Sequence, residues 1–271
     1  MKLSISIAEN AGENAPIVLR GNYVECIKKA SEIGYKAVEI HVNNPLALNI
    51  EEIMNACYLN KISVSTLGTG MGYVIDGLSF TDPDLAIREK AVERILTHIN
   101  VAKKLNAGVI IGSMRGKIPN VKEHIKYEHY AIECLKKVLE NAEKNNVKIF
   151  LEAINRYETN FVNNVEDGLD IIEKVNSNYL KLHLDTFHMN IEEPNIEQSI
   201  ELAGKYLGHL HFADSNRWYP GAGHINFESI IKILKKINYK GFIAFECLPW
   251  PTQDEAAVKA FEYVNALYEI Y

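Results

Sequence analysis

Short apolar or alternating runs recur along the whole chain, and longer segments with helical periodicity separate them. The eight runs lie at Leu3–Ala8, Ala37–Val42, Ile62–Gly68, Gly108–Ser113, Lys148–Ala153, Leu180–Thr186, Leu207–Asp214 and Gly241–Glu246. Each run has strand length, bulky or β-branched residues and a turn residue nearby, which predicts a β-strand. The intervening segments, such as IREKAVERILTHINVAKKLN, predict helices, and several follow capping signals such as TDPD, NVED and Asn226.

Eight strands that alternate with eight helices are typical of an α/β protein with a parallel sheet. Parallel neighbours require helical crossovers, and eight such units close into a (β/α)8 barrel, the TIM barrel. A doubly wound open sheet is the alternative, but the segment after the first run, AENAGENAPIVLRG, does not match GxGxxG. Because no low-complexity linker or matching repeat interrupts the chain, we expect one catalytic domain spanning residues 1–271.

The composition narrows the classes of function. The chain has 271 residues, of which 47% are hydrophobic and 24% charged, with a formal net charge of −6. An acidic balance argues against a nucleic-acid partner, which needs a basic surface. The four scattered cysteines form no CxxC pair, and there is neither a signal peptide nor an apolar run of the ~20 residues that span a membrane. We therefore expect a cytoplasmic protein with no membrane partner.

Four residues that can bind metal ions fall at the ends of the last four expected strands. These are Glu152, Asp185, His211 and Glu246, each about one strand–helix unit after the one before. The chemistry of this barrel lies at the carboxyl ends of its strands, so the four side chains should meet. Three crowded carboxylates repel one another without a cation, and a set rich in oxygen favours Mn²⁺, Mg²⁺ or Co²⁺ over a structural Zn²⁺ site.

The sequence around these residues resembles a known family. The stretches LEAINRYETNF, LDTFHMNIEEP, HLHFADSNRWYPGAGHINF and FIAFECLP are similar to those of ketose 3-epimerases related to D-tagatose 3-epimerase and D-psicose (allulose) 3-epimerase. These enzymes belong to the xylose-isomerase-like TIM-barrel superfamily. The resemblance runs along nearly the whole chain in strand order, and it is most specific between Glu152 and Glu246.

The resemblance implies an isomerase that interconverts C3 epimers of free ketoses of the D-tagatose, D-psicose, D-fructose or L-ribulose type. It implies a divalent metal, most often Mn²⁺, held by the four strand-end residues, and acid–base roles for Glu152 and Glu246. One glutamate would remove the C3 proton and the other would return one to the opposite face, through a metal-stabilised cis-enediolate. Members form dimers or tetramers, so a homodimer or homotetramer is expected.

The same resemblance implies three residues that hold the substrate near its carbonyl group. Positions Glu158, His188 and Arg217 match family residues with that role. His188 and Arg217 could each donate a hydrogen bond to a carbonyl or enediolate oxygen. For Glu158, a salt bridge to Arg156 or Arg217 is an equally good interpretation.

Several further side chains belong near the site by their position. His183 and His209 precede two of the expected ligands by two residues, so they point to the same strand face and would form a layer beneath the metal. We expect Glu39 and His41 to form hydrogen bonds inside the barrel. The glycine-rich segment 66–80 could be a lid that closes over a sugar, or an ordinary surface loop.

The segment after the fourth strand departs from the family pattern. Free-ketose epimerases tend to place an aromatic residue there, whereas this chain has Ser113 and Arg115. These residues would suit a phosphate, a carboxylate or extra hydroxyls at the distal end of the substrate, with Ile7 and Leu248 as apolar walls. A sugar-phosphate epimerase or an aldose–ketose isomerase therefore remains an alternative. An apurinic endonuclease and a non-catalytic sugar-binding protein are weaker alternatives, the first because of the acidic charge.

Overall fold

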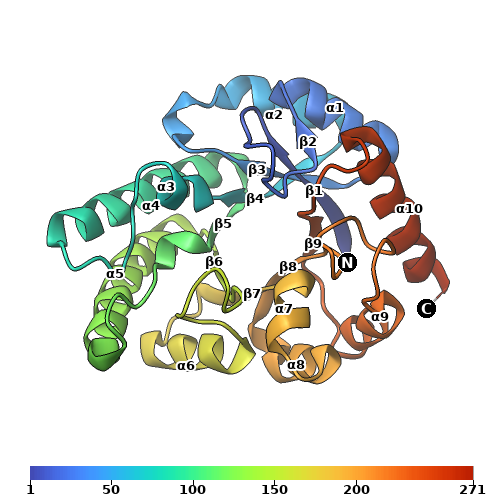
Figure 1. Ribbon diagram of the computed structural model, residues 1–271. Coiled ribbons are helices and arrows are strands. Elements are labelled where there is room, and N and C mark those ends of the chain that lie inside the picture. The colour runs from blue at the N-terminus through green and yellow to red at the C-terminus, as the bar shows by residue number, and fades with distance from the viewer. Residues whose placement is uncertain (271) are drawn as a thin grey trace.

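A computed structural model describes residues 1–270, and its strands form a closed parallel barrel (Figure 1). The barrel strands are β1 (Lys2–Ala8), β3 (Ala37–His41), β4 (Ser63–Gly68), β5 (Gly108–Ile111), β6 (Ile149–Glu152), β7 (Leu180–Asp185), β8 (Leu207–His211) and β9 (Phe242–Phe245). Their order in the sheet is their order along the chain, and pairing of β1 with β9 closes the ring. A two-residue strand, β2 (Leu19–Arg20), pairs with the end of β1. The predicted (β/α)8 barrel is confirmed.

The helices surround the strands in Figure 1. The long crossover helices are α1 (Tyr23–Ile33), α2 (Ile50–Asn60), α4 (Leu85–Leu105), α5 (His124–Asn145), α6 (Val165–Val175), α8 (Ile196–Ala203), α9 (Phe227–Lys236) and α10 (Gln253–Ile270). Two shorter helices, α3 (Gly70–Val74) and α7 (Thr186–Glu192), follow β4 and β7 directly. Short 3₁₀ turns add η1 (Pro45–Ala47), η2 (Ser113–Arg115), η3 (Val121–Glu123) and η4 (Gly204–Tyr206).

The expected capping residues begin their helices. Asp84 accepts a hydrogen bond from the Ala86 amide at the start of α4, and Asn226 accepts one from Ser229 at the start of α9. Asn164 does the same for α6. Each carboxylate or amide oxygen satisfies a backbone N–H that the helix itself leaves without a partner. These local signals fix where the crossover helices begin.

Alternation along the strands sorts side chains between the helical shell and the barrel interior. In β7, Leu182 is fully buried and packs against Gly168 of α6, where a β-carbon would lie only 2.4 Å from its methyl group. The neighbouring residues, His183 and Asp185, are also fully buried but belong to the opposite face. The apolar face stabilises the shell, and the polar face is thereby directed into the barrel.

The segment 66–80 is partly ordered by packing. It contains α3, and Phe80 is fully buried with its amide bonded to the carbonyl of Met114. Val74 and Ile75, at the tip, are 78% and 63% exposed. Its role as a lid stays a prediction. Among residues 1–270, no helix combines the length and the apolar character that crossing a membrane requires.

Candidate active site

The four strand-end residues come together at the carboxyl ends of β6 to β9. Glu152 ends β6, Asp185 ends β7, His211 ends β8 and Glu246 follows β9. One ligand atom from each lies within 4.8 Å of those of the other three. The cluster lies at a cavity of about 190 Å³ that also has His188, Glu158 and Arg217 in its wall. The convergence expected from the sequence is therefore present.

The hydrogen bonding of Asp185 indicates that the cluster suits a divalent cation. Its Oδ1 atom accepts a hydrogen bond from the Phe187 amide at 2.8 Å, which begins α7. Its Oδ2 atom is buried without a hydrogen-bond partner. A buried carboxylate oxygen without a partner is costly, and a cation would satisfy it. Three carboxylates and one imidazole form a donor set that Mn²⁺, Co²⁺ or Mg²⁺ accepts.

The protonation of these residues reflects crowded negative charge. Burial and the nearby carboxylate of Glu246 raise the pKa of Glu152 to about 8. Burial likewise raises the pKa of Asp185 to about 7. Burial favours the neutral form of Glu246 as well, but His211 beside it outweighs that effect and holds its pKa at about 2. In the metal-free protein, protons on Glu152 and Asp185 therefore relieve a repulsion that a cation would otherwise relieve.

A buried carboxylate, Glu39, supports His211 from inside the barrel. Its Oε1 atom lies 2.8 Å from His211 Nε2 and 2.9 Å from His41 Nε2, and its Oε2 atom lies 2.8 Å from His209 Nε2. The histidines outweigh the effect of burial and keep the pKa of Glu39 well below its usual range. Neither ring nitrogen of His211 makes a hydrogen bond of good geometry: Nε2 lies against Glu39, and Nδ1 lies on the side of the cluster, 3.5 Å from Glu246. A carboxylate in this position fixes the orientation of a ligating imidazole.

The expectations for Glu39, His41, His183 and His209 are confirmed in geometry. Glu39 bonds inside the barrel, and His209 lies in the layer beneath the cluster. His183 is fully buried, its ring centre lies 4.0 Å from that of His211, and neither of its nitrogens has a hydrogen-bond partner. Its Nδ1 atom lies 4.0 Å from Glu152 Oε1. Burial keeps the His183 pKa well below its usual value, so its ring is neutral.

His188 is held in one tautomer by a residue that the sequence did not single out. The Asn155 amide nitrogen donates to His188 Nδ1 at 2.7 Å, while the Asn155 oxygen accepts from the Tyr157 amide. Burial, with help from Arg217, keeps the His188 pKa well below its usual value. The neutral ring therefore carries its proton on Nε2, which lies 3.9 Å from both Glu152 and Asp185. His188 can donate that proton in a hydrogen bond to a ligand oxygen.

Glu158 and Arg217 form a pair across the mouth of the cavity. Arg217 Nη1 donates to Glu158 Oε1 at 3.1 Å, and Arg217 Nη2 lies 3.8 Å from Glu246. Asn155 also donates to Glu158, at 3.0 Å. Arg156 pairs instead with Glu192, so of the two salt bridges considered for Glu158 the one to Arg217 forms.

The loop after β8 holds Arg217 in an unusual backbone conformation. Arg217 has a φ angle of 61°, in the left-handed region, and its guanidinium carbon lies 4.8 Å from the centre of the Phe187 ring. The Asp214 carboxylate orders the loop by accepting from the amides of Ser215, Gly221 and Ile225. Residues held in such a conformation by their surroundings are concentrated at functional sites.

Arg115 contradicts the expectation that it faces the substrate. The side chain is 1% exposed, and its guanidinium donates to the carbonyls of Gly112, Phe161 and Val162. Val162 is a β-branched residue at φ 58°, so Arg115 stabilises a strained turn between β6 and α6. The prediction of an Arg115 site for a distal phosphate or carboxylate is wrong, because irregular backbone carbonyls already use its donors.

The cavity wall on the β1, β4 and β5 side is made of small residues. It includes Gly68, Gly112 and Ser113, with Pro16 and Ile110 as its apolar part, and Ile154 after β6 continues the apolar lining. A β-carbon at Gly112 would lie 2.3 Å from Glu152 Oε2, and one at Gly68 would lie 2.5 Å from His41 Nδ1. Only glycine at positions 112 and 68 leaves room for the Glu152 carboxylate and the His41 ring to lie so close to the backbone. Ile7 and Leu248 are not among the lining residues, so their expected role as walls is wrong.

Comparison with known proteins identifies the family. The model of the xylose isomerase-like TIM barrel family matches residues 27–266, and the chain belongs to this family. Within it, the chain is a member of the ketose 3-epimerase group, a group of isomerase-class enzymes. It is 33% identical over 234 residues to the D-psicose 3-epimerase of Ruminiclostridium cellulolyticum, covering 83% of this chain and 78% of that protein.

Other relatives support this family assignment, and they include epimerases with a different reaction position. A crystal structure of D-psicose 3-epimerase with D-tagatose from Clostridium cellulolyticum H10 superposes with a TM-score of 0.84 at 26% identity, covering 99% of each chain. A 3-dehydro-D-guloside 4-epimerase from Escherichia coli is 28% identical, covering 83% of this chain and 87% of that protein. The relatives therefore include enzymes that epimerise different carbons.

Proposed function

We propose that the protein is a metal-dependent ketose 3-epimerase that interconverts C3 epimers of ketoses such as D-fructose, D-psicose, D-tagatose or L-ribulose. The observation that carries the proposal is the convergence of Glu152, Asp185, His211 and Glu246 within 4.8 Å at the carboxyl end of the barrel. Membership of the ketose 3-epimerase group supports the substrate class. We propose that the protein acts in the cytoplasm. We also propose that it forms a homodimer or homotetramer, and light scattering of the purified chain would test this oligomeric state.

Epimerisation at C3 needs an acid and a base in the same cavity. The proton beside a ketone is removed from one face, and another is delivered to the opposite face. Glu152 and Glu246 lie at strand ends that two other strands separate, so their carboxyl groups approach the cavity from different directions. Glu152 has its pKa raised to about 8 while that of Glu246 is lowered to about 2. This split belongs to the metal-free protein, where Glu152 holds a proton and Glu246 does not. The proposed acid and base roles rest on the two carboxyl groups facing one cavity.

The remaining polar residues would hold the substrate. His188 directs its Nε2 proton into the cavity and would donate a hydrogen bond to the oxygen on C2. Arg217 would add a charged donor to the same region, and Glu158 would accept from a hydroxyl while keeping Arg217 oriented. Asn155 would maintain both His188 and Glu158 in position.

A divalent cation would be held by Glu152, Asp185, His211 and Glu246. When bound, such a cation supplies Lewis-acid stabilisation of negative charge on neighbouring sugar oxygens. We propose Mn²⁺ as the preferred metal, with Co²⁺ or Mg²⁺ as substitutes. Burial of Asp185 Oδ2 without a partner supports a cation at this cluster, and the choice of Mn²⁺ rests on the family resemblance.

The alternatives differ in their support. A phosphorylated substrate loses its main argument, because Arg115 is buried and bonded to carbonyls. An aldose–ketose isomerase would use the same acid–base pair but move a proton between C1 and C2 of the sugar. The carbon that exchanges its hydrogen separates these functions.

The test is an epimerisation assay on the purified chain. Protein treated with a chelator is reloaded with Mn²⁺, Co²⁺ or Mg²⁺ and incubated with each of the four ketoses. We expect the C3 epimer of at least one ketose to form with Mn²⁺, and no product from the chelated protein. Formation of an aldose alone, or no conversion of any ketose with any metal, would contradict the proposal.

A further inference from the structure

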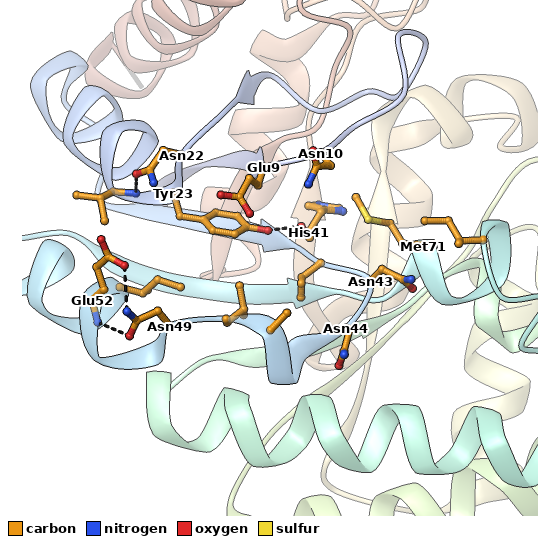
Figure 2. A pocket seen from close by; sticks show the side chains of 16 residues that line it. Glu9, Asn10, Asn22, Tyr23, His41, Asn43, Asn44, Asn49, Glu52 and Met71 are labelled. Carbon is orange, nitrogen blue, oxygen red and sulfur yellow. Dashed lines mark hydrogen bonds between the residues drawn. The ribbon is translucent and has the colours of Figure 1, made fainter.

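A second cavity lies beside the catalytic one at the same end of the barrel (Figure 2). Its volume is about 420 Å³, larger than the 190 Å³ of the catalytic cavity. Its walls come from the segment after β1, the start of α1, the connection from β3 to α2, and α3. Neither the acid–base pair nor the candidate metal ligands line this second cavity. The proposed chemistry therefore gives no reason for its presence.

The two cavities are neighbours that share a wall. His41 lines both of them, and its Nε2 atom lies 3.7 Å from Glu246. In α3, Gly70 lines the catalytic cavity and the next residue, Met71, lines the second. His41 therefore lies between the two cavities, and a ligand that occupies both would have to pass it.

The polar groups of the second cavity suit hydroxyl groups. Five asparagines, two glutamates and one tyrosine contribute to its lining: Asn10, Asn22, Asn43, Asn44, Asn49, Glu9, Glu52 and Tyr23. An asparagine amide can donate to and accept from sugar hydroxyls, and a carboxylate can accept from them. Within residues 1–270, no lysine or arginine lines this cavity. A phosphate or carboxylate group would meet two glutamates and no cation, so a neutral ligand is favoured.

Three of the asparagines keep amide groups available, whereas Asn49 uses both ends of its amide on Glu52. Asn22 caps α1, and Asn44 caps η1 through Oδ1. Their amide nitrogens have no hydrogen-bond partner among the described residues, and neither does the side chain of Asn10. Helix capping accounts for the acceptors of Asn22 and Asn44, and their donors remain for a ligand, as does the whole amide of Asn10.

The cavity also offers an apolar surface. Figure 2 shows the Tyr23 ring beside Glu9, with its hydroxyl end towards His41. The ring is fixed because its hydroxyl donates to the carbonyl of His41 at 3.0 Å. Leu48 and Met71 add further apolar lining. An aromatic face surrounded by amides matches a sugar ring, which has an apolar C–H face and a polar edge.

We propose that the second cavity binds a neutral sugar unit joined to the ketose in the catalytic cavity, so that the protein acts on ketose-containing disaccharides or similar glycosides. This inference rests on the proposed epimerase function. A glycosidic bond at O4, O5 or O6 of the ketose leaves its C2 carbonyl and C3 hydrogen free for the reaction. The catalytic cavity alone is smaller than the range of about 300–1,000 Å³ typical of ligand sites, whereas the two cavities together lie within it.

The test measures the binding of each sugar by calorimetry and its turnover by hydrogen exchange at C3 in D₂O. Isomaltulose, leucrose and lactulose carry a hexose on O6, O5 and O4 of fructose, and D-fructose is the single-unit reference. Calorimetric titration of the Mn²⁺-treated protein gives the affinity for each sugar. Ala47→Trp and Asn10→Trp fill the second cavity from two exposed positions. Leu46→Trp is the control, since Leu46 is 75% exposed in the same turn as Ala47 and does not line the cavity.

We expect at least one disaccharide to bind about tenfold more tightly than D-fructose, which corresponds to about 1.4 kcal/mol. Either filling variant should remove this gain while D-fructose binding stays within about twofold, and Leu46→Trp should keep it. The inference is overturned when no disaccharide binds more tightly than D-fructose, or when both filling variants and the control lose the same affinity. Tight disaccharide binding without hydrogen exchange at C3 would instead preserve the sugar site and contradict the epimerase function.

Discussion

The two halves of the barrel use polar residues in different ways. A side chain that can bind a metal ion stands at the end of β6, β7 and β8 and directly after β9, and the segments that follow supply His188, Glu158 and Arg217. The strands β1, β3, β4 and β5 supply a buried carboxylate, Glu39, and a wall of small residues that includes Gly112. The second half thus carries the chemical groups, while the first half orients them and leaves space for substrate.

This difference shows that one part of the barrel can supply the reactive side chains while another part sets the shape of the cavity. Side chains at strand ends are directed inward by the alternation of the strand, so a ligand residue there needs little further support. In the first half, glycines at the same height admit the Glu152 carboxylate and the His41 ring. The comparison predicts that substitutions in the second half affect catalysis directly, whereas those in the first half act on stability, metal affinity or substrate size.

The largest effect is expected from the two glutamates of the second half. Glu152→Gln and Glu246→Gln keep the size of the side chain but remove the acid or base, so each should lower kcat by about 10³-fold or more. Steady-state assays of ketose epimerisation with saturating Mn²⁺ measure this loss. Glu143→Gln, on the exposed surface of α5, is the matched control and should keep full activity. Retention of a tenth of the wild-type rate by either variant would break the assignment.

Two arginines, one from each half, sharpen the comparison. Arg217→Met should lower kcat/KM by about 10- to 100-fold, because a charged donor to the substrate is lost. Its effect on unfolding free energy should stay within about 1 kcal/mol, as its pair with Glu158 is partly exposed.

Arg115→Met leaves three buried carbonyls without their donor and should lower the free energy of unfolding by about 3 kcal/mol or more. Urea unfolding and steady-state kinetics of both variants test the two predictions. They would be contradicted if Arg217→Met mainly lost stability and Arg115→Met mainly lost kcat/KM.

A smaller effect on catalysis is expected at Glu39. Glu39→Gln keeps the shape but weakens the support of His211, so Mn²⁺ affinity should fall by about 10- to 100-fold. With saturating Mn²⁺, kcat should stay within about tenfold of the wild-type value. Calorimetric titration with Mn²⁺ and assays at high metal concentration separate the two quantities. A loss of kcat as large as that of Glu152→Gln would place the first half in the chemistry itself.

The smallest effect on activity is expected at His98, in α4. Burial lowers its pKa from 6.5 to about 4, so the folded protein keeps His98 neutral. The unfolded chain binds a proton below pH 6.5, and the stability from the neutral ring is therefore lost progressively as the pH falls from 6.5 towards 4. His98→Gln should show a shallower fall in unfolding free energy over this window, with unchanged kcat at pH 7.5. Parallel pH profiles for the two proteins would contradict the prediction.

Features with a fixed period could be predicted from the sequence. The strands, their closure and the meeting of Glu152, Asp185, His211 and Glu246 follow from alternation and from the regular spacing of the strand ends. The inward direction of His209 follows from the same alternation. Family resemblance added the expected roles of these residues, which geometry alone does not assign.

Features that depend on irregular backbone could not be predicted in the same way. Arg115 looked free for a ligand, but its acceptors include carbonyls more than forty positions away, in a turn whose conformation no pattern encodes. Asn155 lies within the stretch LEAINRYETNF, yet its bond to His188 depends on the start of α7. The second cavity arises where several connections meet, and its asparagines look like ordinary helix caps in the sequence.

The most direct test of the central claim is hydrogen exchange with solvent at the reacting carbon. The protein with Mn²⁺ is incubated in D₂O with D-fructose, D-psicose, D-tagatose or L-ribulose, and NMR locates the deuterium. The account predicts deuterium at C3 of at least one ketose and its epimer, with exchange reduced by about 10³-fold in Glu152→Gln and Glu246→Gln. Deuterium at C1 alone, or no exchange in any ketose, would contradict it.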